Sequence, residues 1–324
     1  MVIDAHAHVY EYLRPYGPRG EGRALGGGLL RWPDGKTERF FPARFGDRGF
    51  TAETLLALMH ENAVDKAVLL QAPNYGFQNE YIAAIVQKYP DRFIGACAFD
   101  PYAKRASELF RHFTDDFGCR IVKFEISETW GLSGIHPDLS LDSPLFDPVW
   151  DWAQQRNVTV VIDTGPRGDI NWRTDTIAEV LQRHPELRMV VAHSLFPCSD
   201  GFNDTRLSML SAIAGENCYF DISNLIPGVG TYPYPELQNY LRRLVDLAGA
   251  DHVMWGSDLP SSLCRYDYRE SYRYLIEGEA FSATELSWIL GGTAEKLYFK
   301  QNGMCPTQQN DGITFTAARS SKKC

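Results

Sequence analysis

Eight short apolar segments, each followed by a stretch of helical periodicity, constrain the fold of this chain more than any other feature. The segments are rich in β-branched residues, as buried strands are. Eight strand–helix units with strands that are apolar throughout are typical of a closed parallel barrel rather than an open sheet. We therefore predict an α/β protein with a (β/α)8 TIM barrel, whose strands cover residues 2–7, 67–70, 92–99, 120–126, 158–162, 187–192, 218–222 and 252–255.

The length of the chain suits one large barrel. It has 324 residues, 44% of them hydrophobic, and no shift in composition marks a second domain. We predict a single domain over residues 1–302, with residues 9–50 as a long loop insertion after the first strand. An excursion of that length is usually functional or mobile, and a partly ordered surface insertion is the plainer alternative. The polar tail over residues 303–324 is expected to be disordered.

Charge and cysteine content exclude several classes of partner. The net charge is −9 and the pI about 5.4, which argues against nucleic acid or an anionic membrane as partner. Seven scattered cysteines without a CxxC pattern do not suggest a disulfide framework. No apolar run approaches the roughly 20 residues of a membrane helix, and residues 1–20 lack the pattern of a signal peptide. We expect a cytoplasmic protein that binds a small molecule; its oligomeric state stays open, with a homodimer the commonest assembly.

Polar residues recur at the C-terminal ends of the expected strands, where barrels of this kind carry their chemistry. His6 and His8 stand one residue apart on the first strand, so both imidazoles point to the same side. That spacing suits two adjacent positions around one metal ion. The plainer alternative, two hydrogen-bonded histidines at a polar strand end, loses weight because ligand-type residues recur at the other strand ends: Gln71 to Asn74, Asp100, Lys123, Glu125, Asp163, His193, Asp221, Asn224 and Asp258.

Four motifs in order resemble one enzyme family. They are the N-terminal HxH, "RHPELRMVVAH" before the sixth strand end, "GSDLP" after the eighth strand and "GGTAEKLYF" near the end of the barrel. Together they resemble the amidohydrolase-2 branch of the amidohydrolase superfamily, from residue 2 to about residue 300. That branch includes aminocarboxymuconate-semialdehyde decarboxylase, aromatic-acid decarboxylases, lactonases and other hydrolases.

The resemblance implies roles for individual residues. His6 and His8 would bind one divalent metal ion, with zinc the first expectation and manganese or iron as alternatives. Asp258 would coordinate the ion or take a proton from its bound water, and His193 would shuttle a proton or serve as a further ligand. The fifth strand of the branch usually ends in a metal-binding histidine, where this chain has Asp163. A carboxylate can replace that imidazole; the alternatives are a solvated strand end and a site that holds metal poorly, as in lactonases of the branch that work without a metal.

Lys123 and the loop residues carry further expectations. In other amidohydrolases a fourth-strand lysine is carboxylated and bridges two metals, but Glu125 lies on the same face of the strand, so an ion pair between the two is the plainer expectation. Trp130 and His136, in the loop after the fourth strand, and Asn74 are expected to line the substrate pocket. Arg167 suits a carboxylate, which would make the substrate anionic.

Three functions remain open on the sequence. The first is a metal-dependent hydrolase of a small ester, lactone or amide, in which the ion polarises a carbonyl and activates water. The second is a non-oxidative decarboxylase of an aromatic or muconate-like acid. The third is a catalytically silent barrel that binds a small molecule.

Overall fold

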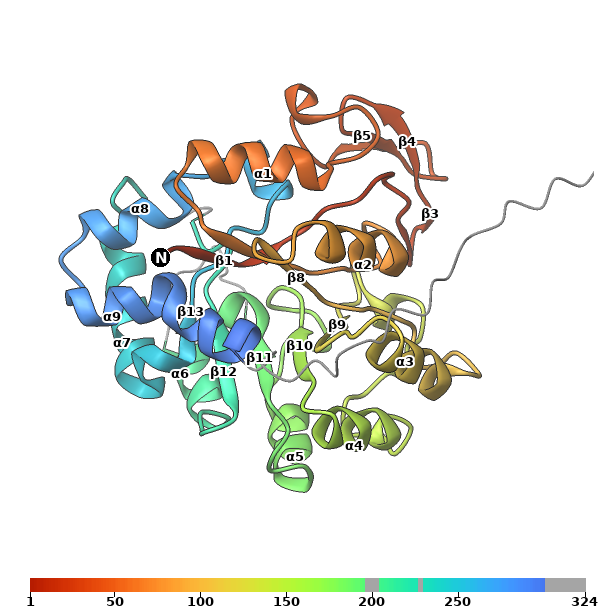
Figure 1. Cartoon of the computed structure of the whole chain (residues 1–324). Coiled ribbons are helices and arrows are strands. Elements are labelled where there is room, and N and C mark those ends of the chain that lie inside the picture. The colour runs from red at the N-terminus through yellow and green to blue at the C-terminus, as the bar shows by residue number, and fades with distance from the viewer. Residues whose placement is uncertain (196–203, 227–229, 301–324) are drawn as a thin grey trace, which may run out of the picture.

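The computed structural model describes residues 1–195, 204–226 and 230–300. Eight parallel strands stand at the centre and helices surround them (Figure 1). The tail expected over residues 303–324 and the domain end at residue 302 lie outside the described residues. The barrel strands are β1 (Ile3–Ala7), β7 (Lys66–Leu69), β8 (Phe93–Gly95), β9 (Ile121–Glu125), β10 (Thr159–Asp163), β11 (Met189–Val191), β12 (Cys218–Asp221) and β13 (Val253–Met254).

Backbone hydrogen bonds join the strands into a closed cylinder. The order β1–β7–β8 forms one sheet and β9–β10–β11–β12–β13 the other, with parallel pairing throughout. Two seams remain. At one, the amide of Cys97 donates to the carbonyl of Ile121 (2.9 Å). At the other, the amide of Ala5 donates to the carbonyl of Trp255 (3.0 Å). The (β/α)8 barrel predicted from the alternating segments is confirmed.

The helices alternate with the barrel strands, as the predicted strand–helix units require. Thr51 caps the first helix, because its side chain accepts the amide hydrogen of Thr54. No helix of the described residues is long and apolar enough to cross a membrane. The helices are α1 (Ala52–Glu61), α2 (Asn79–Lys88), α3 (Ala106–Asp115), α4 (Asp147–Gln155), α5 (Asp175–Arg183), α6 (Asp204–Ser211), α7 (Pro235–Ala248), α8 (Glu270–Glu277) and α9 (Ala283–Ser287), followed by the π-helical segments η6 (Trp288–Gly292) and η7 (Glu295–Phe299).

Alternate strand residues face two separate cores. Val122 and Phe124 of β9 pack outward against the helices, whereas Ile121 belongs to a smaller core inside the barrel. Nearer the C-terminal end of β9, the inward positions are Lys123 and Glu125, which are polar and buried. The inside of the barrel is therefore apolar at one end and charged at the other, and the charged end is the one where the predicted site residues lie.

A β-bulge in β1 turns both histidines into the barrel. Asp4 pairs with Ala67 and Ala7 pairs with Leu69, so β1 contains one more residue than β7 between these two pairs. Ile3 and Ala5 belong to the inner core, whereas Ala7 belongs to the outer one. The extra residue lets His6 and His8 follow Ala5 on the inner side.

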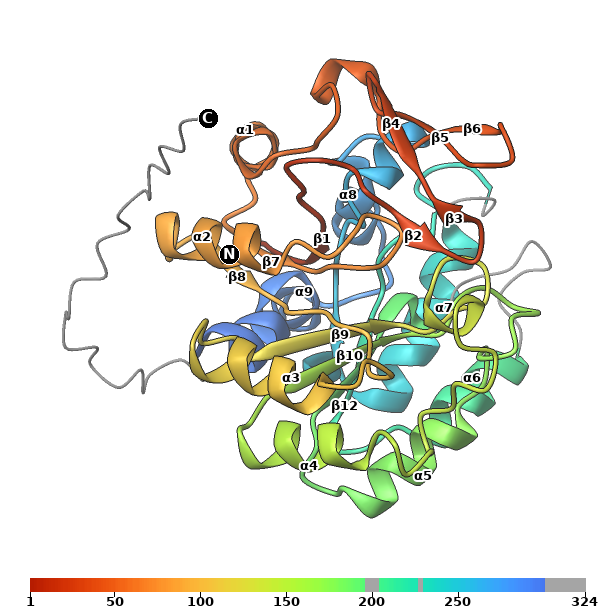
Figure 2. The same cartoon turned by 90° about the vertical axis from the view of Figure 1, so that its right-hand side faces the viewer.

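Residues 9–50 contain short strands of their own. They form a hairpin and a three-stranded antiparallel sheet beside the barrel, seen in red in Figure 2. Trp32, Phe41 and Phe50 anchor this segment in the main core. Gly28 has φ +74°, and a Cβ at this position would lie 2.1 Å from the carbonyl oxygen of Phe41. The strands are β2 (Tyr16–Gly17), β3 (Gly20–Glu21), β4 (Arg23–Gly26), β5 (Leu29–Arg31) and β6 (Thr37–Arg39).

Candidate active site

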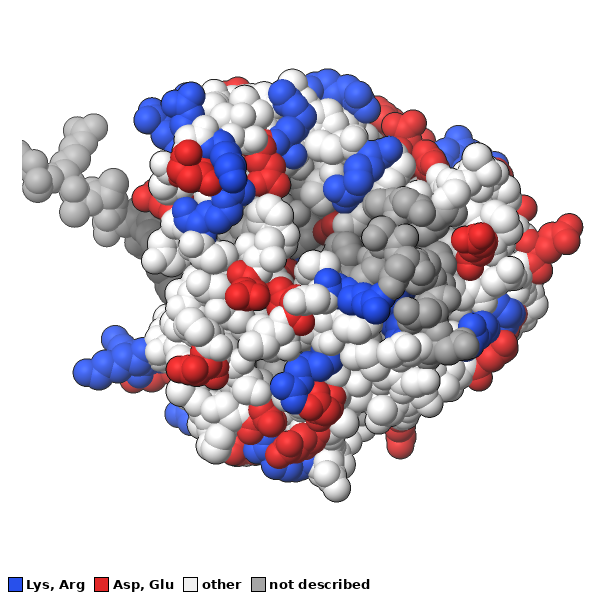
Figure 3. Space-filling view, turned by 180° about the vertical axis from the view of Figure 1, so that it is seen from behind, with Lys and Arg blue, Asp and Glu red and all other residues white. Residues whose placement is uncertain are grey.

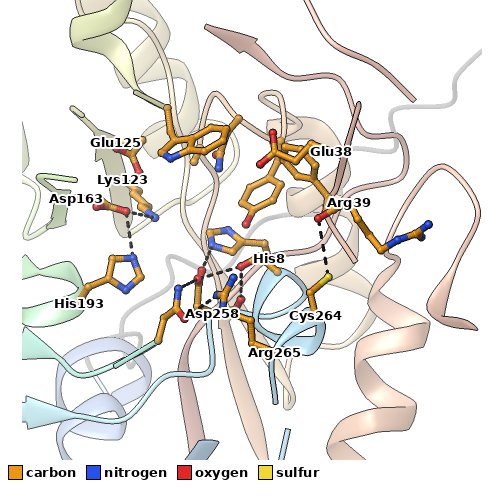
Figure 4. Close-up of a pocket in the computed structure, with 17 residues that line it drawn as sticks. His8, Glu38, Arg39, Lys123, Glu125, Asp163, His193, Asp258, Cys264 and Arg265 are labelled. Atoms are coloured by element: carbon orange, nitrogen blue, oxygen red, sulfur yellow. Dashed lines mark hydrogen bonds and ion pairs between the residues drawn. The ribbon is translucent and has the colours of Figure 1, made fainter. Parts of the chain in front are cut away.

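A cavity of about 230 Å³ opens at the charged end of the barrel. The face of the molecule in Figure 3 is hollowed, with Lys and Arg side chains beside the hollow. Figure 4 shows its lining residues, which come from the barrel strands, the first insertion and the loop after β13. The lining includes His8, Glu38, Arg39, Phe40, Asn74, Tyr75, Lys123, Glu125, Trp130, Asp163, His193, Asn224, Asp258, Ser261, Cys264 and Arg265.

Three acceptor atoms converge at the base of this cavity. The Nε2 atoms of His6 and His8 are 3.2 Å apart, and Oδ1 of Asp258 lies 3.2 Å from the His8 nitrogen and 3.7 Å from the His6 nitrogen. All three residues are buried. Separations of this size are the edges of a tetrahedron whose centre is about 2.1 Å from each corner, which is the usual distance from zinc to imidazole nitrogen or carboxylate oxygen.

Hydrogen bonds behind the imidazoles leave both Nε2 lone pairs free of protons. Nδ1 of His8 lies 2.9 Å from the carbonyl oxygen of Leu70, which can only accept. Nδ1 of His6 lies 2.5 Å from Oδ2 of Asp221. In neutral imidazoles the proton therefore sits on Nδ1 in both rings. Burial lowers the pKa of His8 to about 4, and burial together with Lys123 lowers the pKa of His6, so both rings are neutral at pH 7.

These residues fit a metal ion, because the three acceptor atoms face one another and none of them can donate a hydrogen to another, which suits a cation. A carboxylate or carbonyl behind each ring is the usual support of a metal-bound histidine. His6, His193 and Asp258 also place one ligand atom each within 4.8 Å of one another. The cluster is therefore a candidate His/Asp metal site.

A second group of charges lies beside this cluster. Oδ2 of Asp163 lies 3.3 Å from Nζ of Lys123 and 3.3 Å from Nε2 of His193. Nδ1 of His193 lies 2.9 Å from the hydroxyl of Ser223. Glu125 also hydrogen-bonds Asp163, and burial together with the Asp163 carboxylate raises the pKa of Glu125 well above its usual value. Asp163 thus pairs with two cations, and the ion pair of Lys123 is with Asp163, not with Glu125 as expected.

The ion pair sets the protonation of His193. Burial by itself would lower its pKa, but the Asp163 carboxylate more than offsets this and raises the pKa to about 9. His193 is therefore an imidazolium at pH 7, held between Asp163 and Ser223. A charged imidazole with a fixed hydrogen-bond acceptor at each nitrogen can donate a proton to a substrate that enters beside it.

Backbone strain gathers at the same strand ends. His193, Ser194 and Leu195 after β11, Asn224 after β12 and Asp258 after β13 all have positive φ between 43° and 60°. Such conformations cost free energy in non-glycine residues and persist where surrounding contacts hold them. Nδ2 of Asn224, for example, donates to Oδ2 of Asp258 (2.8 Å) and fixes that carboxylate.

Two of the four predicted pocket residues line the cavity, namely Trp130 and Asn74. His136 instead hydrogen-bonds Asp100 (2.8 Å) and stacks on Tyr102, outside the lining. Arg167 is exposed, with its guanidinium 6.0 Å from the ring of Trp172. Loop residues have no periodicity that fixes their direction, so nearness in sequence to a strand end did not bring these two side chains to the cavity.

Two residues of the site received no role from the sequence, namely Asp221, which was noted only at the end of the seventh strand, and Arg265. Asp221 stands directly behind His6; the period of two along β12 places it inside the barrel, which was a usable signal. Arg265 lines the cavity and donates to Oδ1 of Asn224 (2.7 Å). It lies in the turn after β13, and its position there follows from the tertiary fold alone.

The comparisons with known proteins identify the family of the chain. The family model Amidohydro_2, described as amidohydrolase, matches residues 3–300. The chain belongs to this amidohydrolase family. The family membership confirms the resemblance carried by the four motifs and the prediction of an amidohydrolase-related enzyme.

One curated relative of this amidohydrolase is an L-fucono-1,5-lactonase of Burkholderia ambifaria, 26% identical over 136 residues. The match spans 40% of this chain and 44% of the relative, less than half the length of either.

Solved structures share the fold over most of the chain. A probable 2-pyrone-4,6-dicarboxylic acid hydrolase of Acinetobacter baumannii has a TM-score of 0.66 at 17% identity, covering 91% of this chain and 98% of that one. A zinc-bound amidohydrolase of Burkholderia multivorans has a TM-score of 0.66 at 20% identity, and the match covers 92% of this chain and 99% of that one. A 5-carboxyvanillate decarboxylase of Sphingomonas paucimobilis has a TM-score of 0.55 at 18% identity, and the match covers 75% of this chain and 81% of that one.

Proposed function

We propose that this amidohydrolase hydrolyses a small lactone that carries a negatively charged group, with a divalent ion, zinc first, held by His6, His8 and Asp258. The observation that carries the proposal is the convergence of three acceptor atoms beside the buried pair of His193 and Asp163 in the wall of one cavity. The curated lactonase and the solved pyrone-dicarboxylic acid hydrolase support a lactone as the substrate.

Asp258, His193 and Asp163 each have a separate role in the proposed hydrolysis. A divalent ion at the three acceptors would polarise the substrate carbonyl and lower the pKa of bound water. Asp258, whose second carboxylate oxygen is fixed by Asn224 and Ser261, takes the proton of the attacking water. His193 donates a proton to the leaving oxygen of the opened ring. Asp163 holds His193 in its charged form and is a positioning residue in this scheme.

The cavity wall suggests how the substrate is held. Arg265 hydrogen-bonds Asn224 through one nitrogen, and its remaining N–H groups suit a carboxylate. Phe40, Tyr75 and Trp130 supply flat apolar surface on the other walls. The insertion over residues 9–50 contributes Phe40 and carries eight Lys and Arg against five Asp and Glu in a chain of net charge −9, which favours an anionic substrate at the mouth.

The aromatic walls also favour a second candidate, decarboxylation of an aromatic acid. The same cluster would hold the carboxylate, and His193 would protonate the ring carbon after CO2 leaves. The solved decarboxylase of the same fold supports this alternative.

We also propose a cytoplasmic location, which the free thiols of Cys97, Cys119, Cys218 and Cys264 support. We further propose a homodimer, which size-exclusion chromatography with light scattering would test.

A substrate screen with matched variants tests the proposed function. We expect ring opening of L-fucono-1,5-lactone, 2-pyrone-4,6-dicarboxylate or a related lactone, at a rate that Asp258→Asn and His193→Gln each lower at least 100-fold. Asp251→Asn, at an outer turn, serves as the control with unchanged activity. Release of CO2 from aromatic acids without lactone cleavage would favour the decarboxylase, and no turnover of either class would refute both.

A further inference from the structure

Lys123 lies against the candidate metal site from the side of β9. Its ammonium is buried, 3.2 Å from Nε2 of His6 and 3.3 Å from Oδ2 of Asp163. Figure 4 shows it beside the carboxylate of Asp163, to which a dashed line joins it. Lys123 therefore donates hydrogen bonds to one acceptor of each charged cluster.

The contact with His6 conflicts with metal binding. Because Nδ1 of His6 carries the ring proton and donates it in a hydrogen bond to Asp221, Nε2 has one lone pair and no proton. One lone pair can accept a hydrogen from an ammonium or coordinate an ion, but not both. An ion about 2.1 Å from that nitrogen would also lie within about 5 Å of Nζ, so two positive charges would share one buried site.

Two carboxyl groups beside Lys123 offer its ammonium other partners when an ion takes the lone pair of His6. Asp163 already accepts from it, and Glu125, two residues along the same strand, faces the same side. A turn of the side chain toward these groups would free His6 while leaving the ammonium paired. The same contacts argue against carboxylation of Lys123, because a carbamate oxygen would face the carboxylate of Asp163.

We propose that the ammonium of Lys123 and a divalent metal ion are alternative occupants of the His6 lone pair, so that Lys123 competes with the metal and makes its binding weak and exchangeable. The proposal rests on the proposed function for the existence of the ion site. In the metal-free protein Lys123 is the cation that the converging acceptors require. In the loaded protein Lys123 pairs with Asp163 alone.

The experiment measures zinc affinity in the full-length protein after dialysis against a chelator, by competition with a chromophoric chelator. Lys123→Met removes the charge, and we expect it to bind one zinc per chain at least tenfold more tightly than the wild type. Lys123→Gln, which keeps a donor for Asp163, should show the same gain if Lys123→Met folds poorly. Lys66→Met is the matched control, because Lys66 pairs with Glu295 (3.1 Å), away from the cavity. Adding His8→Ala to either Lys123 variant should remove the gain.

Three results would overturn the proposal. Equal zinc affinity of the wild type and both Lys123 variants, with weaker binding in His8→Ala, would show that the ion site exists and that Lys123 does not compete; the proposed function would stand. Loss of zinc in the Lys123 variants would make Lys123 a ligand rather than a competitor. Zinc binding no tighter than in His8→Ala throughout would refute both the competition and the metal part of the proposed function.

Discussion

Asp221→Asn tests the support behind His6. The carboxylate lies 2.5 Å from Nδ1 of His6, and both side chains are almost fully buried. It keeps the proton on Nδ1 and raises the basicity of Nε2, where an ion would bind. Across the ring, the carboxylate would be about 7 Å from that ion. At an effective dielectric constant of about 20, its attraction for a divalent cation is about 5 kcal/mol.

Asparagine keeps the shape and one acceptor, so we expect only part of this energy to be lost. Supporting carboxylates of metal-bound histidines typically change metal affinity by about 10- to 100-fold, which is about 1.4 to 2.7 kcal/mol. A second effect follows, because Oδ1 of Asp221 accepts the amide hydrogen of Ser223 (2.6 Å). The amide group of asparagine can serve only one of these two donors, so we also expect about 1 to 3 kcal/mol lower stability.

Zinc competition and urea unfolding measure the two effects on the same protein. Asp116→Asn is the matched control, because Asp116 pairs with Nδ1 of His112 on the exposed surface of α3. It should change neither zinc affinity nor stability by more than about 0.5 kcal/mol. Zinc affinity of Asp221→Asn within twofold of the wild type would refute the role given to Asp221, whatever its stability.

Three further outcomes are expected. Tyr268→Phe, which removes a hydroxyl 2.8 Å from the buried carboxylate of Asp4, should lower the free energy of unfolding by about 1 to 3 kcal/mol in urea titrations. Phe41→Ala should cost about 3 to 5 kcal/mol and expose the insertion to limited proteolysis, because Phe41 is fully buried. In the presence of a chelator, the free energy of unfolding should fall by about 3 kcal/mol between pH 6.5 and pH 9. The pKa of His193 is about 9 in the folded protein and 6.5 in the unfolded chain. The stabilisation that His193 contributes is therefore complete below pH 6.5 and is lost as the pH rises. His193→Gln should flatten that slope, and an unchanged slope would contradict the ion pair with Asp163.

The sequence by itself determined the barrel and the family. Alternating strand and helix patterns depend on local periodicity, and eight of them have few other ways to bury their strands. The same periodicity predicted that His6 and His8 share a face and that Asp258 and His193 stand at strand ends. The motifs around these residues added the family.

Only the tertiary structure decided which polar groups face each other. Asp163 pairs with Lys123 and His193, Asp221 stands behind His6, and Arg265 reaches the cavity from a turn. These contacts join residues far apart in the chain, and their distances depend on how the strands close and on the bulge in β1. Sequence periodicity gives the side of a strand to which a residue points, whereas the partner across the barrel follows from the closed cylinder alone.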